Sequence, residues 1–286
     1  MAGNAGNAGN AGNAGNTGGV GAVNTGSLGT PIFPDRVDLP FVTVDYPPGQ
    51  PIANNRVKLS VYPARRWGSE WRAWYALSEY TATRWARIIV APWDDTLTQG
   101  EVDELVCAAR DERADALSEI VAQHDEFASY FLALLTMTPN GYPNTFRLIN
   151  LASIVGTFTV LHFKAGADPK GSYPGYSPRP RPSQICPALL PPVPVPGHPS
   201  YPSGHSTEAH LIAAVLDDVL ASAPQRVPKD DLEALAWRIA RNREIAGLHY
   251  PQDSEAGQKL ATDILPFLQL THEYQTVLKD AQNEWQ

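Results

Sequence analysis

The feature that most constrains the fold is a proline-dense segment in the second half of the chain. Eleven of the 26 prolines lie between Pro174 and Pro202. Proline fixes φ and donates no backbone hydrogen bond, so this segment cannot continue a helix or form a central strand. We predict an ordered, irregular crossing loop over 165–203, partly in the polyproline II conformation. It could serve as a ligand for an SH3-type domain, but the polar residues at its two ends favour the wall of an active site.

The blocks on either side of this loop are predicted to be helical, because apolar residues recur in them with helical periodicity. The expected helices cover about 99–117, 118–137, 144–164, 204–222, 229–246 and 252–269, with a short tail helix to the end. Thr98 and Glu101 have the spacing of a capping box. Since 43% of the 286 residues are hydrophobic, the chain can bury a real core. We expect one all-α domain over 31–286, a helical bundle with an extended N-terminal arm.

The N-terminal sequence predicts a tail and an arm. Residues 2–16 are five Ala-Gly-Asn triplets, and glycine-rich sequence continues to about Thr30. This composition predicts a disordered tail over 1–30, because it offers nothing that could form a core. Residues 31–64 are rich in proline and β-branched residues, which favours extended structure for the arm.

A stripe of tryptophans follows the arm at helical spacing. It consists of Trp67, Trp71, Trp74 and Trp85. Such a stripe could line a substrate pocket, but core packing is the usual explanation, so we expect these side chains to be buried.

Charge and composition exclude several classes of protein. The 22 basic and 30 acidic residues give a formal net charge of −8, which argues against a nucleic-acid binder. The most apolar stretch, 146–163, contains several polar residues and barely reaches spanning length, so we expect a buried helix and no membrane span. Cys107 and Cys186 do not form a disulfide framework. No secretory signal is visible, and a soluble cytoplasmic protein is expected, with a homo-oligomer left open.

Three cations and a predicted helix start point to an oxyanion site. Lys164, Arg181 and Arg243 occur in a chain that is acidic overall, and planar guanidinium groups suit a tetrahedral oxyanion. Ser203 and Gly204 open a predicted helix, whose N–H groups and dipole also favour an anion.

Two histidines and an aspartate supply groups for a reaction at that anion. Asp253 follows His249 by four residues, where its carboxylate can accept the Nδ1 proton and leave Nε2 free as a nucleophile. His205 lies at the predicted helix start and can act as a general acid and base. Each residue alone has an ordinary structural explanation, but their joint order favours phosphoryl transfer without an obligatory metal.

These residues resemble the signature of the superfamily of type 2 phosphatidic acid phosphatases and vanadium haloperoxidases. That signature has three parts, K-x6-R-P, P-S-G-H and S-R-x5-H-x3-D. The matching residues, in that order, are Arg181 and Pro182; Pro202, Ser203, Gly204 and His205; and Arg243, His249 and Asp253. The resemblance spans about residues 145–265 and implies the helical bundle of this superfamily.

The chain departs from the signature at two places. Asn242 stands where the third part has serine, and the gap between the lysine and Arg181 is far longer than in the family. Lys164 is preferred as the anion-binding lysine because it ends an apolar helix, with Lys170 as the alternative. An extra arginine, Arg179, precedes Arg181, which is a frequent variant in the family.

The resemblance implies a role for each residue. His249 would attack phosphorus in line and form a phosphohistidine, while Asp253 would orient it. His205 would protonate the leaving alkoxide and then activate water. The groups that would hold the oxygens of the anion are Lys164, Arg181, Arg243 and the backbone amides of Ser203 and Gly204.

The same pocket serves two chemistries in the superfamily. Phosphatases hydrolyse phosphate esters, whereas haloperoxidases hold vanadate on the residue equivalent to His249 and oxidise halide with hydrogen peroxide. The lipid-directed members are multi-span membrane proteins, so we expect a soluble phosphomonoesterase that acts on a small soluble phosphate ester without a cofactor. His198 stands where bromoperoxidases carry histidine, which keeps a vanadium haloperoxidase with bound vanadate as the alternative. A non-catalytic oxyanion-binding protein is the third reading.

Overall fold

The computed structural model of the chain describes residues 42–43, 58–59, 68–166, 178–224 and 227–286. The predicted tail, almost all of the predicted arm, Trp67 and Lys170 lie outside the described residues. Within the arm, β1 (Val42–Thr43) pairs antiparallel with β2 (Lys58–Leu59).

All other regular elements in the described chain are helices, which confirms the predicted all-α class. Three short 3₁₀ helices occur at Trp85–Arg87, Asp95–Leu97 and Pro187–Leu189. The α-helices are α1 (Ser69–Thr81), α2 (Thr98–Asp111), α3 (Arg113–Asp125), α4 (Ala128–Leu134), α5 (Pro143–Lys164), α6 (Pro182–Ile185), α7 (Gly204–Leu220), α8 (Lys229–Ile245), α9 (Pro251–Gln269) and α10 (His272–Asn283).

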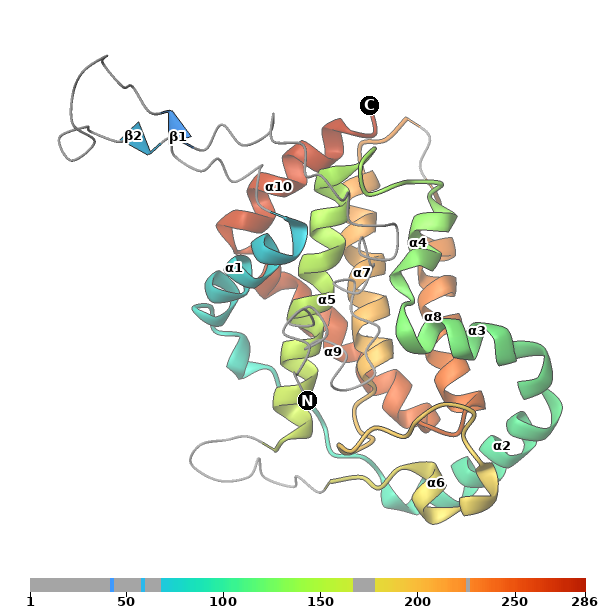
Figure 1. Cartoon of the computed structure of the whole chain (residues 1–286). Helices are drawn as coiled ribbons and strands as arrows, with labels where there is room; N and C mark the ends of the chain where they lie inside the picture. Colours follow the sequence, from blue (N-terminus) through green and yellow to red (C-terminus); the bar gives the residue numbers. More distant parts are fainter. Residues whose placement is uncertain (1–41, 44–57, 60–67, 167–177, 225–226) are drawn as a thin grey trace, which may run out of the picture.

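Helix α7 is the centre of the bundle. It packs against α5, α8 and α9, and α1 and α10 pack against α5 (Figure 1). Fourteen of its 17 residues are buried, as expected of a helix with neighbours on nearly every side. The shorter helices α2, α3 and α4 lie against α8. The long helices α5, α7, α8 and α9 therefore form the core of the bundle.

Helix α5 is the one helix in the described part of the chain that is long and apolar enough to cross a membrane. Its most apolar window has a mean hydropathy of 1.4, and 67% of that window is buried inside the protein. Its neighbours are α1, α7 and α10. This burial is typical of a central helix in a bundle and agrees with the buried helix predicted for 146–163.

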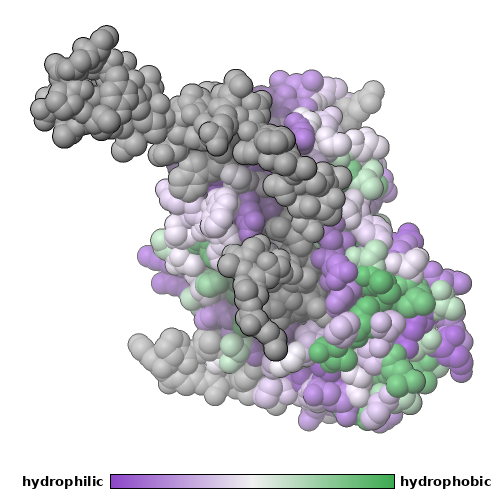
Figure 2. Space-filling view, viewed as in Figure 1, coloured by the Kyte–Doolittle hydropathy of each residue, from purple (hydrophilic) through white to green (hydrophobic). Residues whose placement is uncertain are grey.

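Some large apolar side chains of α2 and α3 are exposed on the surface and do not join the core. Figure 2 shows apolar side chains gathered there, and the exposed large residues include Val106, Leu117 and Val121. Each of these two helices buries only a few side chains against α8 and its neighbours. Part of the apolar face that predicted the helices is therefore exposed.

Three predictions for the first half of the chain are wrong in detail. The two helices predicted over 99–117 and 118–137 are three, because the first ends at Asp111 and the chain turns again between Asp125 and Ala128. Thr98 does not cap α2, because Leu97 is the N-cap residue and makes no side-chain capping bond. Among the tryptophans, Trp85 is buried, but Trp71 and Trp74 are 66% and 44% exposed, since α1 buries its alanine face instead.

Gly257 allows α9 to approach the first turn of α7 closely. A Cβ at this position would lie 2.7 Å from both Ser203 O and Ser206 Cβ, so a larger residue must push the helices apart. We expect Gly257→Ala to lower the free energy of unfolding by roughly 1–3 kcal/mol. Chemical denaturation measures this change.

Gly100 provides the matched control for that substitution. It lies in α2, and a Cβ there would meet nothing within 4 Å. Gly100→Ala is expected to stabilise the protein by about 0.5–1 kcal/mol, because alanine has the higher helix propensity. Equal effects of the two substitutions would contradict the close approach at Gly257.

A carboxyl group lies in the core between α5 and α7. Glu208 is fully buried beside Gly156, its Oε2 accepts a hydrogen bond from Ser153 at 2.8 Å, and its Oε1 has no hydrogen-bond partner. Burial raises the pKa of Glu208 to about 8, so the carboxyl is protonated in the folded protein at neutral pH.

This buried carboxyl predicts a pH-dependent stability. The pKa of Glu208 is about 8 when folded and near 4.5 when unfolded, so the unfolded chain releases the proton first and stability falls as pH rises between these values. Glu208→Gln should remove this pH dependence. Its free energy of unfolding should therefore rise relative to that of wild type by up to about 4 kcal/mol as the pH increases from about 5 to about 8. Urea unfolding at both pH values tests this, and a difference independent of pH would contradict it.

Candidate active site

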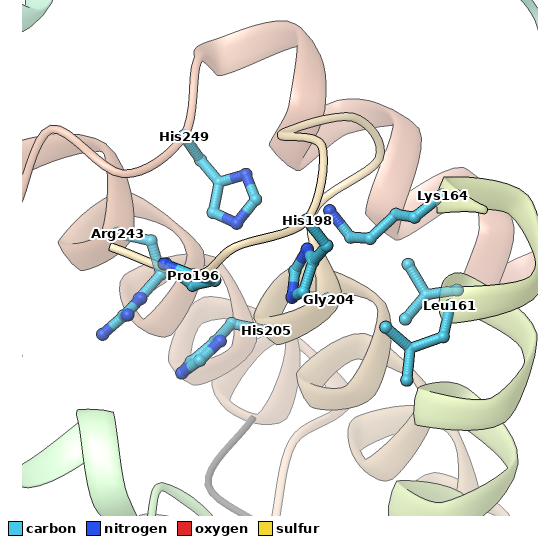
Figure 3. Close-up of a pocket in the computed structure, with 9 residues that line it drawn as sticks. Leu161, Lys164, Pro196, His198, Gly204, His205, Arg243 and His249 are labelled. Atoms are coloured by element: carbon cyan, nitrogen blue, oxygen red, sulfur yellow. The ribbon is translucent and has the colours of Figure 1, made fainter. Parts of the chain in front are cut away.

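A small pocket lies where three long helices end. The C-terminal ends of α5 and α8 and the N-terminal end of α7 meet there, and the proline-rich loop closes one side. Figure 3 shows His249 and His205 reaching this space from different segments. The residues that line it are Val160, Leu161, Lys164, Pro196, His198, Gly204, His205, Arg243 and His249.

The end of α8 explains the spacing between Arg243 and His249. Gly247 adopts a φ of +75°, its N–H donates to Glu244 O at 2.7 Å, and the N–H of Leu248 donates to Arg243 O at 3.0 Å. This pair of bonds is a Schellman cap, in which glycine takes the left-handed position. The N–H of His249 also donates to Arg243 O at 3.3 Å, so the turn places both side chains at one pocket.

His249 is oriented by Asp253, as the sequence predicts. Asp253 lies in the first turn of α9, and its Oδ2 is 3.0 Å from His249 Nδ1 and accepts from the N–H of Tyr250 at 3.1 Å. A carboxylate can only accept, so Nδ1 carries the proton and Nε2 has the lone pair. That lone pair accepts from Arg181 Nη1 at 3.0 Å.

Asp253 is itself held by residues that the sequence analysis did not assign to the site. Arg179 donates to Asp253 Oδ1 at 2.8 Å and also pairs with Glu101, while Ser200 donates to Asp253 Oδ2. The guanidinium of Arg179 lies 3.7 Å from the centre of the Tyr250 ring. The available signals were the extra Arg-Pro before Arg181 and a serine among the prolines, neither of which indicates a partner.

Three buried cations surround the pocket. Arg243 is 1% exposed, and its Nε and Nη1 have no hydrogen-bond partner. Arg181 contacts His249 and also donates to the carbonyl of Leu248 at 2.9 Å. The ammonium group of Lys164 donates to two carbonyl oxygens of the proline-rich loop, at 2.7 and 2.6 Å. Among the described residues that line the pocket there is no carboxylate, so its charge is positive.

Burial, together with this positive charge, shifts the pKa values of the site. Burial, followed by the charge of Arg181, lowers the pKa of Arg243 to about 9, and burial lowers that of Arg181 to about 10. Burial and then Arg181 lower the pKa of Lys164. Burial and nearby arginines also hold the pKa values of His205 and His249 well below their usual range. Both arginines are charged and both imidazoles are neutral at pH 7.

His205 lies in the first turn of α7 with one nitrogen engaged. Its Nε2 is 3.3 Å from the carbonyl of Gln123, at the end of α3. Because a carbonyl accepts, Nε2 carries the proton of the neutral ring and Nδ1 keeps the lone pair. Phe127 packs beside the ring at 5.2 Å. Gln123 is a further contact that sequence reasoning missed, since it depends on how α3 packs.

The predicted role of the Ser203 amide is wrong. Its N–H donates to the carbonyl of Asp253 at 2.9 Å and is therefore committed to joining α7 to α9. The Ser203 side chain caps α7 by accepting from the N–H of Ser206. Gly204 does line the pocket, whereas Ser203 does not.

The remaining two sequence features have clear positions. His198 is half-buried in the pocket wall, with its Nδ1 3.0 Å from Arg181 Nη2. Asn242, which replaces the serine of the signature, donates to Glu119 at 3.0 Å and to Gln123 at 2.9 Å. Asn242 therefore joins α8 to α3 and does not line the pocket.

The pocket is small in this conformation. Its volume is about 10 Å³, which is room for about one water molecule. The direct contact between Arg181 and His249 Nε2 fills the position in front of this nitrogen. An anion must therefore replace this contact in order to reach Nε2.

Comparison with protein families and with curated proteins adds no relative. No protein-family model matches the chain, and no curated protein matches it significantly.

Proposed function

We propose that the protein is a phosphohydrolase of the type 2 phosphatidic acid phosphatase type, which cleaves a small phosphate monoester through a phosphohistidine. The observation that carries this proposal is the buried guanidinium of Arg243, with two nitrogens that lack a partner at a pocket whose described lining residues include no carboxylate. A buried unpaired cation is costly, and an oxyanion is the group that would satisfy it.

The anion-binding groups come from three segments of the chain. Arg181 and Arg243 would hold two oxygens through their guanidinium groups, and the helix start at Gly204 would hold a third. When Arg181 turns to the phosphate, it releases the lone pair of His249 Nε2, so substrate binding would also free the nucleophile. Lys164 would stabilise the proline-rich wall through its carbonyl contacts and add positive charge.

The reaction would follow in two steps. His249 Nε2 attacks phosphorus, the P–N bond forms as the ester P–O bond breaks, and the leaving alkoxide takes a proton from His205. Water then attacks phosphorus and gives its proton to His205, and the P–N bond breaks to release phosphate. A bound phosphate dianion would raise the lowered pKa of His205 and so supply the protonated form needed first. Asp253 stabilises the charge on His249 in both steps.

A vanadium haloperoxidase is the second candidate, and the position of His198 favours it. His198 lies in the pocket wall and contacts Arg181, where it can adjust the group that holds the anion. The donors that fit phosphate also fit vanadate: Arg181, Arg243, Gly204 and His249. Bound vanadate would supply the activation of hydrogen peroxide for halide oxidation.

Parallel assays of the purified protein test the proposal. We expect hydrolysis of p-nitrophenyl phosphate, with vanadate as an inhibitor because it adopts the five-coordinate geometry of the phosphoryl transition state. Bromination of a dye with bromide, peroxide and vanadate should be slow in comparison. Fast bromination with only trace hydrolysis would instead establish the haloperoxidase, and absence of both activities with vanadate still bound would leave a non-catalytic oxyanion-binding protein.

A further inference from the structure

Arg179 lies behind the pocket, buried between two carboxylates. Its side chain pairs with Glu101 in the first turn of α2 and donates to Asp253 Oδ1 in the first turn of α9 at 2.8 Å. Three segments that are far apart in the sequence therefore meet at one guanidinium group. The proposed reaction gives Arg179 no role, although only Asp253 separates it from His249.

The two oxygens of Asp253 have different partners. Oδ2 is 3.0 Å from His249 Nδ1 and accepts from the N–H of Tyr250 and the hydroxyl of Ser200. Oδ1 accepts from Arg179. The donors at Oδ2 are neutral, whereas Arg179 brings a positive charge. A carboxylate that is 0% exposed keeps its own charge only where a cation and hydrogen bonds replace the lost water.

The cations at the pocket are not available for this task when substrate is bound. Arg181 would turn to the phosphate in the proposed reaction, while Lys164 and Arg243 line the pocket, where a bound dianion would compensate their charge. Arg179 does not line the pocket. Its charge therefore stays with Asp253 throughout the reaction.

Arg179 is itself held in place. Its guanidinium lies 3.7 Å from the centre of the Tyr250 ring and pairs with Glu101. Glu101 also accepts from the backbone N–H and the side-chain amide of Gln252, at 2.9 Å each, which joins α2 to α9. Two carboxylates and one guanidinium leave one net negative charge behind His249, which favours positive charge on its ring.

We infer that Arg179 is a positioning residue for the phosphoryl transfer, which holds Asp253 ionised with Oδ2 aimed at His249 Nδ1 and so keeps Nε2 free to attack phosphorus. Without Arg179, Oδ1 loses its charged partner, and the carboxyl group can rotate or take up a proton. A neutral carboxyl group stabilises neither the Nδ1–H tautomer nor the positive charge of the phosphohistidine. The inference rests on the proposed function, because the nucleophilic role of His249 does.

Steady-state kinetics of Arg179→Met test the inference, with Arg179→Lys as the conservative variant. Arg179→Met should lower kcat for p-nitrophenyl phosphate by about 10²-fold, which is the usual effect of misplacing a reacting group. KM should stay close to that of wild type, because the anion-binding groups are untouched. Arg179→Lys returns a positive charge and should recover part of the lost kcat. Arg238→Met, which removes an exposed cation that pairs with Glu119, should leave kcat unchanged.

A double variant covers the case in which Arg179→Met does not fold. Adding Glu101→Gln to Arg179→Met removes the second carboxylate that would be left unpaired, so the protein should fold and still lose about 10²-fold in kcat. Glu101→Gln alone keeps Arg179 on Asp253 and should lose less than the double variant. Thermal unfolding checks that each variant is folded.

The Nδ1 proton of His249 reports the positioning without any turnover. In wild type this proton is buried and bound to a carboxylate, so it should give a downfield ¹H NMR resonance that is protected from exchange with water. His249→Ala identifies the resonance by its loss. It should move upfield or disappear in Arg179→Met and in the double variant, and remain in Arg238→Met.

Three results would overturn the inference. The first is wild-type kcat in a folded variant that lacks Arg179, and the second is an unchanged Nδ1 resonance in that variant. The third is an equal loss of kcat in Arg179→Lys and Arg179→Met, which would assign the effect to the shape of the side chain and not to its charge. If wild type hydrolyses no phosphate ester, the proposed function fails, and the resonance still decides whether Arg179 holds Asp253 against His249.

Discussion

Replacing His249 with alanine is expected to abolish phosphate-ester hydrolysis and leave the fold intact. In the proposed reaction His249 supplies the nitrogen that bonds to phosphorus, and no described side chain near the pocket duplicates it, so turnover should fall by at least about 10⁴-fold. The fold should survive because Asp253, left without its imidazole, still accepts hydrogen bonds from Arg179, Ser200 and the N–H of Tyr250. Steady-state kinetics and thermal unfolding of the variant measure both parts.

His205→Ala is the companion variant, because it removes the proposed proton donor and leaves the proposed nucleophile in place. Its loss should be about 10²–10⁴-fold for an alkyl phosphate and clearly smaller for p-nitrophenyl phosphate, whose leaving group departs without a proton. In His249→Ala, turnover should fall equally for both substrates. More than about one-hundredth of wild-type turnover in His249→Ala, with the fold intact, would remove the phosphohistidine from the mechanism.

The helices and the gathering of the site could be predicted because both follow from local sequence. The long apolar runs around Phe146 and Leu211 have helical periodicity, and burial on several sides preserves it as α5 and α7. Arg243 and His249 are separated by one helix cap, so their spacing alone places them together. This short-range geometry does not depend on how the helices of the bundle pack.

What could not be predicted depends on partners far away in the chain. Glu101 has the spacing of a capping residue, but its partner is Arg179, 78 residues later. The Ser203 amide begins a helix, where an anion could bind, yet α9 approaches closely enough for the carbonyl of Asp253 to take it. The exposure of Trp71 likewise depends on which face of α1 packs against α5. Sequence periodicity does not record such pairings.

Arg179→Met is expected to cause the largest loss of stability. The guanidinium of Arg179 is fully buried and bridges Glu101 and Asp253, so its removal leaves two carboxylates at a site that water does not reach. Breaking a buried ion pair from one side typically costs about 3–5 kcal/mol. Methionine keeps the volume of the side chain, so the loss reports charge and not a cavity. Chemical denaturation of both proteins gives the difference.

Arg238→Met is the control for that loss, since it breaks an ion pair that water does reach. Arg238 pairs with Glu119, and its side chain is 63% exposed, so the change should stay within about 1 kcal/mol. Adding Glu101→Gln to Arg179→Met should recover part of the stability, because one of the two stranded charges is then gone. Equal losses at Arg179 and Arg238 would mean that Asp253 does not depend on Arg179. The orientation of His249 would then come from the turn before α9 and from Ser200 alone.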